Sequence, residues 1–188
     1  MLIKQIGLFF GTFDPLHNGH VLIANYFIEK LSLDELRLVV TPLNPFKNKS
    51  TVSNEKKRLE MVSDFCINEK QINCSKVEFD LPKPNYTADT LDYIVKKNPG
   101  SKLFVILGED NLNTLHKWKD FKKILQHKIC VYPRKNLKKE DKRILEHENI
   151  KLYDAPLMEI SSTLIRERIS GGKSIKHLVP NVILNHLM

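Results

Sequence analysis

Cysteine is scarce in this chain of 188 residues, and its positions exclude two kinds of site. The three cysteines, Cys66, Cys74 and Cys130, lie far apart in the sequence and form no C-x-x-C pair. An odd, scattered set of cysteines does not build a disulfide framework, and it does not supply a cysteine zinc site. We therefore expect three reduced thiols without a chemical role.

Long apolar runs are absent as well. No run approaches the ~20 residues needed to cross a bilayer, and the opening MLIKQIGLFFG lacks the cleavage site and the longer apolar centre of a secretion signal. With 41% hydrophobic and 28% charged residues, the chain can bury a core beneath a polar surface. These features predict one domain, residues 1–188, located in the cytoplasm and without a membrane partner.

Excess positive charge is confined to one segment. The net charge is +8, and residues 117–143, with eleven basic and three acidic residues, account for all of it. Such a segment can form a nucleic-acid interface, but no aromatic residues alternate with its lysines as base stacking would require. A solvated surface is therefore favoured and no nucleic acid is expected. A non-enzymatic nucleic-acid-binding module stays open as the alternative from another functional class.

Apolar runs that alternate with amphipathic segments predict strands separated by helices. The expected strands are residues 3–9, 36–40, 77–81, 102–108, 128–133 and 150–156. The expected helices are residues 19–31, a helix from a Ser53 or Asn54 cap to about 67, 87–98 with a Thr87 cap, two short helices around Trp118, 138–147, 162–170 and 179–187. This order requires crossover connections, so it predicts an α/β fold with a doubly wound parallel sheet and C-terminal helices.

The chemically unusual stretches of the chain follow the predicted strands. They are GTFDPLHNGH (11–20), TPLNPFK (41–47), LPKPNYT (81–87), GEDNL (108–112), YPRK (132–135) and APLMEISS (155–162). In open α/β sheets, ligands bind beyond the carboxyl ends of the strands. We therefore expect these stretches to line one binding crevice.

The stretch GTFDPLHNGH has the residue types of a phosphate-binding turn. Gly11 lets the backbone approach a bulky anion, Asp14-Pro15 makes a turn, and the N–H groups of the helix that follows favour an anion. His17 and His20 can lie on one side of that turn and donate hydrogen bonds to phosphate. Alone, two histidines at this spacing also fit a structural role or half a metal site, but no third metal ligand is nearby.

A second anion site is predicted near the C-terminus, in ISSTLIR (160–166). Ser161, Ser162 and Thr163 offer hydroxyl and N–H groups at a helix start, and Arg166 lies about one turn further on. An ordinary capped helix with a surface arginine is the alternative. The presence of a first phosphate motif at the other end of the chain favours two anion sites that face each other.

The string GTFDPLHNGH resembles the signature of the nucleotidyltransferase superfamily, a G-x-F-x-P turn followed by H-x-G-H, and in particular that of bacterial nicotinate-nucleotide adenylyltransferases. The segment ISSTLIRERISGGKSIKHLVPNVILNHL (160–187) is similar to the second signature of that family. NYTADTL (85–91), ILGEDNL (106–112) and Trp118 resemble further family segments in the same order. The similarity extends from about residue 5 to the end of the chain, and it implies a Rossmann-like nucleotidyltransferase fold.

The resemblance implies that AMP is transferred from ATP to the phosphate of nicotinate mononucleotide in NAD biosynthesis, which gives nicotinate adenine dinucleotide and pyrophosphate. His17, His20 and Arg166 would be the catalytic residues because they would hold the triphosphate as charge develops. Mg²⁺ would bridge phosphate oxygens of ATP, with no protein metal site. The implied ATP contacts are Gly11, Thr12, Phe13, His17, Gly19, His20, Ile106, Gly108, Asp110, Ile160, Ser161, Ser162, Thr163 and Arg166.

The implied acceptor contacts come from the middle of the chain. Trp118 would stack on the pyridine ring, although a buried core tryptophan is the alternative. Tyr86 and Thr87 would present backbone N–H groups to the nicotinate carboxylate. Lys47 and Arg134 follow strands where the mononucleotide phosphate would lie, and solvated cations are the alternative for both.

Two positions depart from the family pattern, and other acceptors stay open. Phe10 stands where the family usually has a glycine, and Phe46 stands where it often has a histidine. Nicotinamide mononucleotide and pantetheine phosphate are the alternative acceptors. The superfamily members that act on pantetheine phosphate typically lack a Y-T-x-D-T-L segment followed by a tryptophan, which this chain has. The sequence also leaves open whether the chain forms a homo-oligomer.

Overall fold

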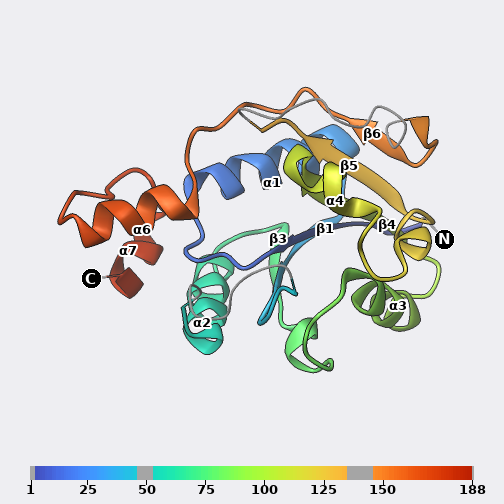
Figure 1. The fold of residues 1–188 in the computed structure, drawn as a ribbon, viewed down its shortest axis with the longest axis horizontal. Helices are drawn as coiled ribbons and strands as arrows, with labels where there is room; N and C mark the ends of the chain where they lie inside the picture. Colours follow the sequence, from blue (N-terminus) through green and yellow to red (C-terminus); the bar gives the residue numbers. More distant parts are fainter. Residues whose placement is uncertain (1–2, 46–52, 135–145, 188) are drawn as a thin grey trace.

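Six parallel strands form one sheet in the computed structural model of this chain, which describes residues 3–45, 53–134 and 146–187 (Figure 1). The strands are β1 (Gln5–Gly11), β2 (Glu35–Val40), β3 (Ile72–Ser75), β4 (Lys102–Gly108), β5 (Lys128–Tyr132) and β6 (Ile150–Leu152). They lie in the order β3-β2-β1-β4-β5-β6, and each neighbouring pair is parallel. The chain leaves β1 first toward β2 and later returns to its other side with β4. The predicted doubly wound sheet is therefore confirmed, with its switch point between β1 and β4.

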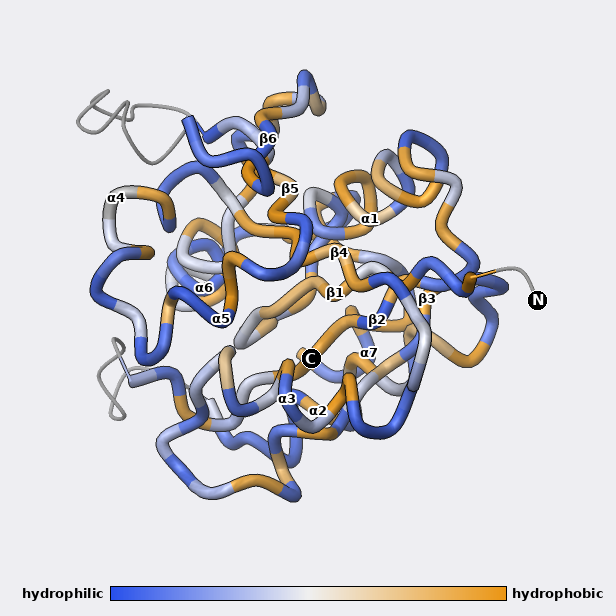
Figure 2. The backbone as a smooth tube through the Cα atoms, turned by 90° about the vertical axis from the view of Figure 1, so that its right-hand side faces the viewer, coloured by the Kyte–Doolittle hydropathy of each residue, from blue (hydrophilic) through white to orange (hydrophobic). Residues whose placement is uncertain are grey.

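Helices cover both faces of the sheet and divide the core into two clusters. They are α1 (Asn18–Leu31), α2 (Glu55–Cys66), α3 (Thr87–Lys97), α4 (Leu112–Leu115), α5 (Phe121–Ile124), α6 (Ser162–Ser170) and α7 (Asn181–Leu187). Along β1, Ile6 and Leu8 pack with α3, α4 and α5, whereas Phe9 packs with α1, α2, α6 and α7. This alternation follows from the two-residue period of a strand. Figure 2 shows the resulting hydrophobic strands inside and hydrophilic loops around them.

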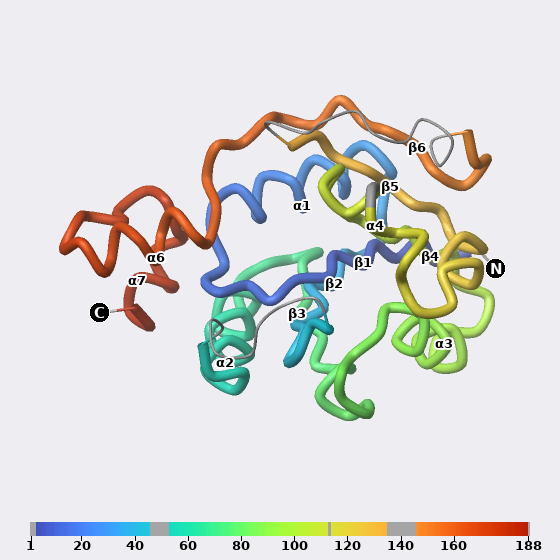
Figure 3. The backbone as a smooth tube through the Cα atoms, in the orientation of Figure 1, coloured from blue at the N-terminus to red at the C-terminus, as the bar shows by residue number. Residues whose placement is uncertain are grey.

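The C-terminal helices lie at the end of the sheet where β1 finishes. Figure 3 follows the chain from β6 across the molecule to α6, beside the beginning of α1. Two hydrogen bonds fix this contact, because Asn18 donates its backbone N–H to the Leu178 carbonyl (2.9 Å) and its side-chain amide to the His177 carbonyl (2.7 Å). The segment that follows β6 is therefore placed against the turn that follows β1.

A buried arginine holds the loops that leave β1 and β2. Arg58 of α2 is 1% exposed, and its guanidinium donates to the carbonyl oxygens of Thr12 (2.5 Å), Thr41 (2.9 Å), Pro42 (2.9 Å) and Ser53 (3.2 Å). Carbonyl groups buried at the end of a strand need a donor once the sheet ladder stops. Arg58 supplies that donor for two neighbouring loops at once.

The predicted strand at 77–81 is wrong, and β3 lies a few residues earlier. Residues Val77–Phe79 form a single 3₁₀ turn, in which the Phe79 N–H donates to the Lys76 carbonyl (2.8 Å). In a strand, residues two apart share one face. Here Val77 packs against the cluster of α3, whereas Phe79 packs against the cluster of α1 and α2. The alternation of V-E-F therefore reflects a turn between two cores.

Smaller differences concern the ends of elements. Asn54 is the cap of α2, where its side chain accepts from the Lys56 N–H (2.9 Å). Thr87 is the first residue of α3, and Tyr86 is its cap without a side-chain hydrogen bond. The last strand ends at Leu152, and most of the predicted helix at 138–147 lies outside the described residues. No helix in the described ranges combines the length and the apolar character that a membrane span requires.

Replacing Arg58 by methionine keeps most of the side-chain volume but leaves the three buried carbonyl groups of Thr12, Thr41 and Pro42 without their donor. We expect the variant to lose about 3–4 kcal/mol of unfolding free energy in urea denaturation. Arg168→Met is the matched control, because exposed Arg168 makes a single hydrogen bond to the Ser174 carbonyl. Equal losses in the two variants would contradict the anchoring role of Arg58.

Candidate active site

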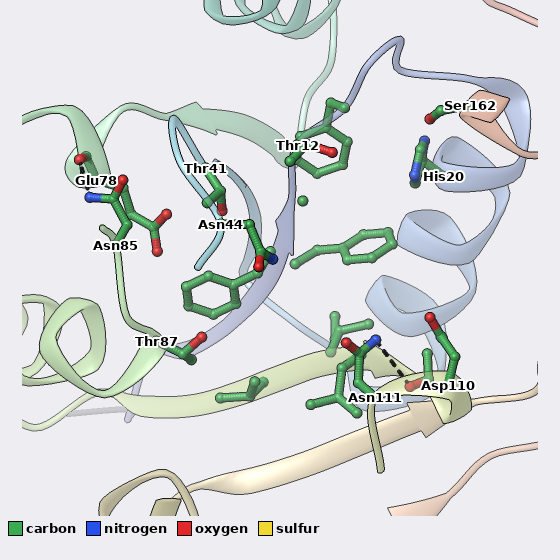
Figure 4. Close-up of a pocket in the computed structure, with 18 of the residues that line it drawn as sticks. Thr12, His20, Thr41, Asn44, Glu78, Asn85, Thr87, Asp110, Asn111 and Ser162 are labelled. Atoms are coloured by element: carbon green, nitrogen blue, oxygen red, sulfur yellow. Dashed lines mark hydrogen bonds between the residues drawn. The ribbon is translucent and has the colours of Figure 1, made fainter. Parts of the chain in front are cut away.

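A cavity of about 500 Å³ opens beyond the carboxyl ends of the central strands (Figure 4). Its size suits a nucleotide-sized ligand. Of the residues predicted to bind ATP or the acceptor, those that line it are Gly11, Thr12, Phe13, His17, His20, Tyr86, Thr87, Ile106, Gly108, Asp110, Trp118, Arg134, Ser161, Ser162, Thr163 and Arg166. Segments from both ends of the chain and from its middle therefore meet at one place.

Two of the described residues that were predicted to bind ATP do not line the cavity itself. Gly19 and Ile160 line a small adjoining hollow, which shares His17 and His20 with the cavity. Lys47 lies outside the described residues, as does the departure at Phe46.

The two histidines cap the beginning of α1 reciprocally. The His20 N–H donates to Nδ1 of His17 (3.3 Å), and the His17 N–H donates to Nδ1 of His20 (3.3 Å). Their rings are stacked, with centroids 3.6 Å apart. Because each Nδ1 accepts a hydrogen bond, the proton of each neutral ring must be on Nε2. The Nε2 N–H group of His17 can therefore donate to an oxygen atom of a ligand, and the His20 ring is stacked beside it on the cavity wall.

Burial keeps His17 neutral. His17 is only 2% exposed. Burial, reinforced by the positive charge of Arg134, lowers the pKa of His17 to about 3. Protonation of Nδ1 would also break the hydrogen bond that caps α1. In this structure His17 is thus a hydrogen-bond donor without charge.

Two glycines make room for side chains of this turn. A β carbon at position 19 would lie 3.0 Å from Nδ1 of His17, and one at position 11 would lie 2.8 Å from the ring of Phe13. Phe13 itself is buried and has a positive φ of 47°. Gly11 therefore serves the packing of Phe13, in addition to any approach of an anion.

The beginning of α6 is joined directly to the turn after β1. Ser161 caps α6 by accepting from the Leu164 N–H (3.1 Å), and Ser162 donates its hydroxyl to the Pro15 carbonyl (3.0 Å). Arg166 donates from Nη1 to the Asp14 carbonyl (2.6 Å). Its guanidinium remains partly exposed on the cavity wall, where it can meet an anion.

Asp14 connects three segments at the edge of the cavity. Asp14 is buried, with 6% of its surface exposed. Its carboxylate accepts hydrogen bonds from the backbone N–H of Ser53 (3.1 Å) and from the Ser53 hydroxyl, and it lies 3.8 Å from Nη1 of Arg166. The charge of this buried group is therefore compensated by α6 and by the residue before the α2 cap.

Arg134 lies among the predicted ATP residues. Its guanidinium is over the ring of Tyr132 (5.2 Å to the centroid), donates to the Tyr132 hydroxyl (3.1 Å), and has Nε 3.6 Å from Oδ1 of Asp110. Its charge also acts on His17. The sequence analysis groups Arg134 with the acceptor, and in the structure it lies beside Asp110, which the same analysis assigns to ATP.

The opposite wall is formed by the beginning of α3 and the loop before it. Asn85 donates its N–H to the Leu43 carbonyl (3.1 Å) and its side-chain amide to the Glu78 carbonyl (2.7 Å). These bonds fix the residues that follow, Tyr86 and Thr87, on the cavity wall. The first N–H groups of a helix favour a carboxylate, so this wall suits an acidic ring substituent.

Sequence reasoning missed several polar residues of the cavity, above all Glu78. The other missed residues are Thr41, Asn44, Asn85 and Asn111. Burial raises the pKa of Glu78 to about 7, while hydrogen bonds from the Thr90 and Thr41 hydroxyl groups act in the opposite direction. The available signal was an acid between two apolar residues in V-E-F, a stretch that the sequence analysis assigns to a strand.

The described part of the basic segment is partly neutralised by α3. Lys119 pairs with Asp89 (2.8 Å), and Lys123 pairs with Asp92 (2.8 Å). Ion pairs of this kind are common on solvated surfaces and contribute little to stability. They favour the surface interpretation over a nucleic-acid interface.

Comparisons with known proteins agree on one family. Residues 8–168 match the family model described as cytidylyltransferase-like. A chain of Flavobacterium psychrophilum named probable nicotinate-nucleotide adenylyltransferase is 45% identical, with 97% of this chain and 95% of that one covered. A Bacillus licheniformis chain of the same name is 31% identical, with 96% of this chain and 94% of that one covered. A solved structure of a Plasmodium falciparum nicotinic acid mononucleotide adenylyltransferase complexed with NaAD has the same fold, with a TM-score of 0.80, 18% identity, and 98% and 94% of the chains covered.

The depressed pKa of His17 makes a prediction about stability. Between about pH 6.5 and 3, the unfolded chain binds a proton at His17 that the folded chain does not, so stability falls as the pH decreases. His17→Asn keeps a capping side chain without a titratable group. From pH 7 to pH 5, the wild type should lose about 2 kcal/mol more unfolding free energy than the variant. Parallel losses in urea denaturation would contradict a neutral His17.

Proposed function

The chain belongs to the nicotinate-nucleotide adenylyltransferases, within the cytidylyltransferase-like family, and we infer that its cavity is where AMP passes from ATP to nicotinate mononucleotide. An oxygen of the acceptor phosphate forms a bond to the α-phosphorus of ATP, and the bond from that phosphorus to the departing pyrophosphate breaks. The products are nicotinate adenine dinucleotide and pyrophosphate. One observation carries this assignment to the cavity: His17, His20 and the beginning of α6 line the same space as Tyr86, Thr87 and Trp118.

The wall formed by α1 and α6 would hold the triphosphate. His17 and His20 would each donate from Nε2, and Arg166 would add a charge-assisted hydrogen bond. Ser161, Ser162 and Thr163 would contribute hydroxyl and N–H groups at the start of α6. Because these donors are fixed before the ligand arrives, they stabilise charge that grows on the leaving pyrophosphate.

The nucleoside of ATP would lie toward β4 and β5. Gly108 and Asp110 would contact the ribose, and Ile106 and Ile160 would flank the adenine. Arg134, beside Asp110 and His17, would reach phosphate from this side. Gly11, Thr12, Phe13 and Gly19 would shape the turn beneath the phosphates.

The wall formed by α3 would hold the acceptor. Backbone N–H groups of Tyr86 and Thr87 would bind the nicotinate carboxylate, and Trp118 would stack on the pyridine ring. Lys47 would contact the acceptor phosphate.

The transfer needs no protein nucleophile, since the acceptor phosphate attacks directly. The protein contributes alignment of the two phosphates and charge stabilisation. Within the described ranges, no group of three or more His, Cys, Asp or Glu side chains is arranged to hold a metal ion. Mg²⁺ bound through the oxygens of ATP would supply further charge neutralisation.

Acceptor choice tests the assignment. With ATP and Mg²⁺ at about pH 6, pyrophosphate release should require a pyridine mononucleotide, and kcat/KM should be at least about tenfold higher for nicotinate than for nicotinamide mononucleotide because the carboxylate gains charge-assisted hydrogen bonds. Pantetheine phosphate should give no release. Equal rates with the acid and the amide would contradict the preference.

Replacing His20 by alanine removes one donor to the triphosphate. Turnover should fall by about 10²–10³-fold, as is usual for the loss of one preorganised donor. His186→Ala is the matched control, because His186 pairs with Asp64 between α7 and α2 and does not line the cavity. A nucleic-acid-binding module would instead show strongly salt-dependent binding that survives the His20 change. Full turnover in His20→Ala would refute the assigned role.

A further inference from the structure

Glu78 lies on the acceptor side of the cavity. It belongs to the turn Val77–Phe79 and lines the same space as Tyr86 and Thr87. Figure 4 shows its side chain directed toward Thr41 and Asn44, across the cavity from His20 and Ser162. The position is fixed from two directions, because Thr90 of α3 donates to its Oε1 (2.8 Å) and its own carbonyl accepts from Asn85 (2.7 Å).

One oxygen of this carboxyl group lacks a partner. Glu78 is 1% exposed, and no donor in the part of the chain that the structure describes reaches Oε2. A buried carboxylate is stable when its oxygens accept hydrogen bonds, and an unmatched oxygen favours the protonated form. Consistently, burial raises the pKa of Glu78 to about 7.

No nearby cation among the described residues compensates a charge on Glu78. The groups that act on it are the hydroxyls of Thr90 and Thr41. Arg58 is bound to the carbonyls of Thr41 and Pro42, and Lys119 is paired with Asp89 on α3. A negative charge on Glu78 would therefore act across the low-dielectric acceptor side of the cavity.

We propose that Glu78 makes the choice between acid and amide acceptors depend on its own charge. The neutral side chain admits a mononucleotide whose ring carries a carboxylate, whereas the ionised side chain opposes it and leaves the amide unaffected. This inference rests on the proposed function of the cavity and adds a specificity-determining residue to it.

The physical basis is the interaction of two like charges in one site. Two carboxylates that share a water-poor cavity cannot both ionise without cost. Binding of the acid acceptor therefore favours the protonated form of Glu78, and ionisation of Glu78 weakens binding by the same factor. The uncharged carboxamide of the other acceptor has no such coupling.

The test is the ratio of kcat/KM for nicotinate mononucleotide to kcat/KM for nicotinamide mononucleotide, measured across pH. Ionisation of ATP and of the phosphate common to both acceptors cancels in this ratio. From about pH 6 to about pH 8.5 the wild-type ratio should fall by about tenfold. In Glu78→Gln, which keeps the shape but cannot ionise, the ratio should stay constant within about twofold.

Two further variants make the outcome specific. Thr90→Val removes the hydrogen bond that favours the ionised form, so the fall in the ratio should move to higher pH. Glu60→Gln, the same chemical change on the exposed surface of α2, should keep the wild-type profile. Thermal melting identifies any variant that does not fold. The pH dependence of the wild-type ratio can be measured even if a variant fails to fold.

The outcomes separate this inference from the assigned reaction. If neither mononucleotide supports pyrophosphate release at any pH, the proposed function fails. If nicotinate mononucleotide is used but the wild-type ratio is independent of pH, or falls equally in Glu78→Gln, the role of Glu78 is refuted and the function stands.

Discussion

The hydrogen bond from Arg166 to the Asp14 carbonyl (2.6 Å) joins residues 152 positions apart, and the cavity depends on it. β1 ends at the centre of the sheet and α6 begins after β6 at its edge, so sheet pairing alone does not bring them together. The contact is reinforced by Ser162 on Pro15 and by Asn18 on the His177 and Leu178 carbonyls. The described segment after β6 thus closes the crevice that an open parallel sheet leaves at its switch point.

The same region shows how buried polar groups are satisfied without loss of function. The side chains of Arg58 and Asp14 form hydrogen bonds with the loops that follow β1 and β2, and these bonds set the shape of the cavity walls. His17 and His20 each use Nδ1 to accept a backbone N–H at the cap of α1. The same two hydrogen bonds therefore fix the beginning of α1 and the tautomer of each ring, and they orient both rings before any ligand binds.

The sequence predicts most strands and helices of this fold where the local hydrophobic pattern matches the burial of the segment. β1 and β4 are almost continuous apolar runs, as strands covered on both faces are, and the motifs at the two ends of the chain contain many of the residues that line the cavity. The prediction fails at Val77–Phe79, because a three-residue alternation is too short to distinguish a strand from a turn between two core clusters. The same error concealed Glu78, because an acid within a predicted short strand gave no reason to expect a buried group in the site.

The two walls of the cavity differ in how their charge is fixed. On the side where we propose that ATP binds, Arg166 and Arg134 present guanidinium groups, and burial lowers the pKa of His17, which makes it a neutral donor. In the proposed role this wall would bind phosphate, which both substrates carry, so it would not distinguish between acceptors. On the α3 side, the cavity combines helix N–H groups with one acid whose charge is poorly compensated. Discrimination between two rings that differ by a carboxylate and an amide is a difference between two binding free energies, and it can arise from a group that opposes one of them. If the proposed sites are correct, the wall of α1 and α6 would supply the chemistry, and the wall around Glu78 is where we propose that acceptors are told apart.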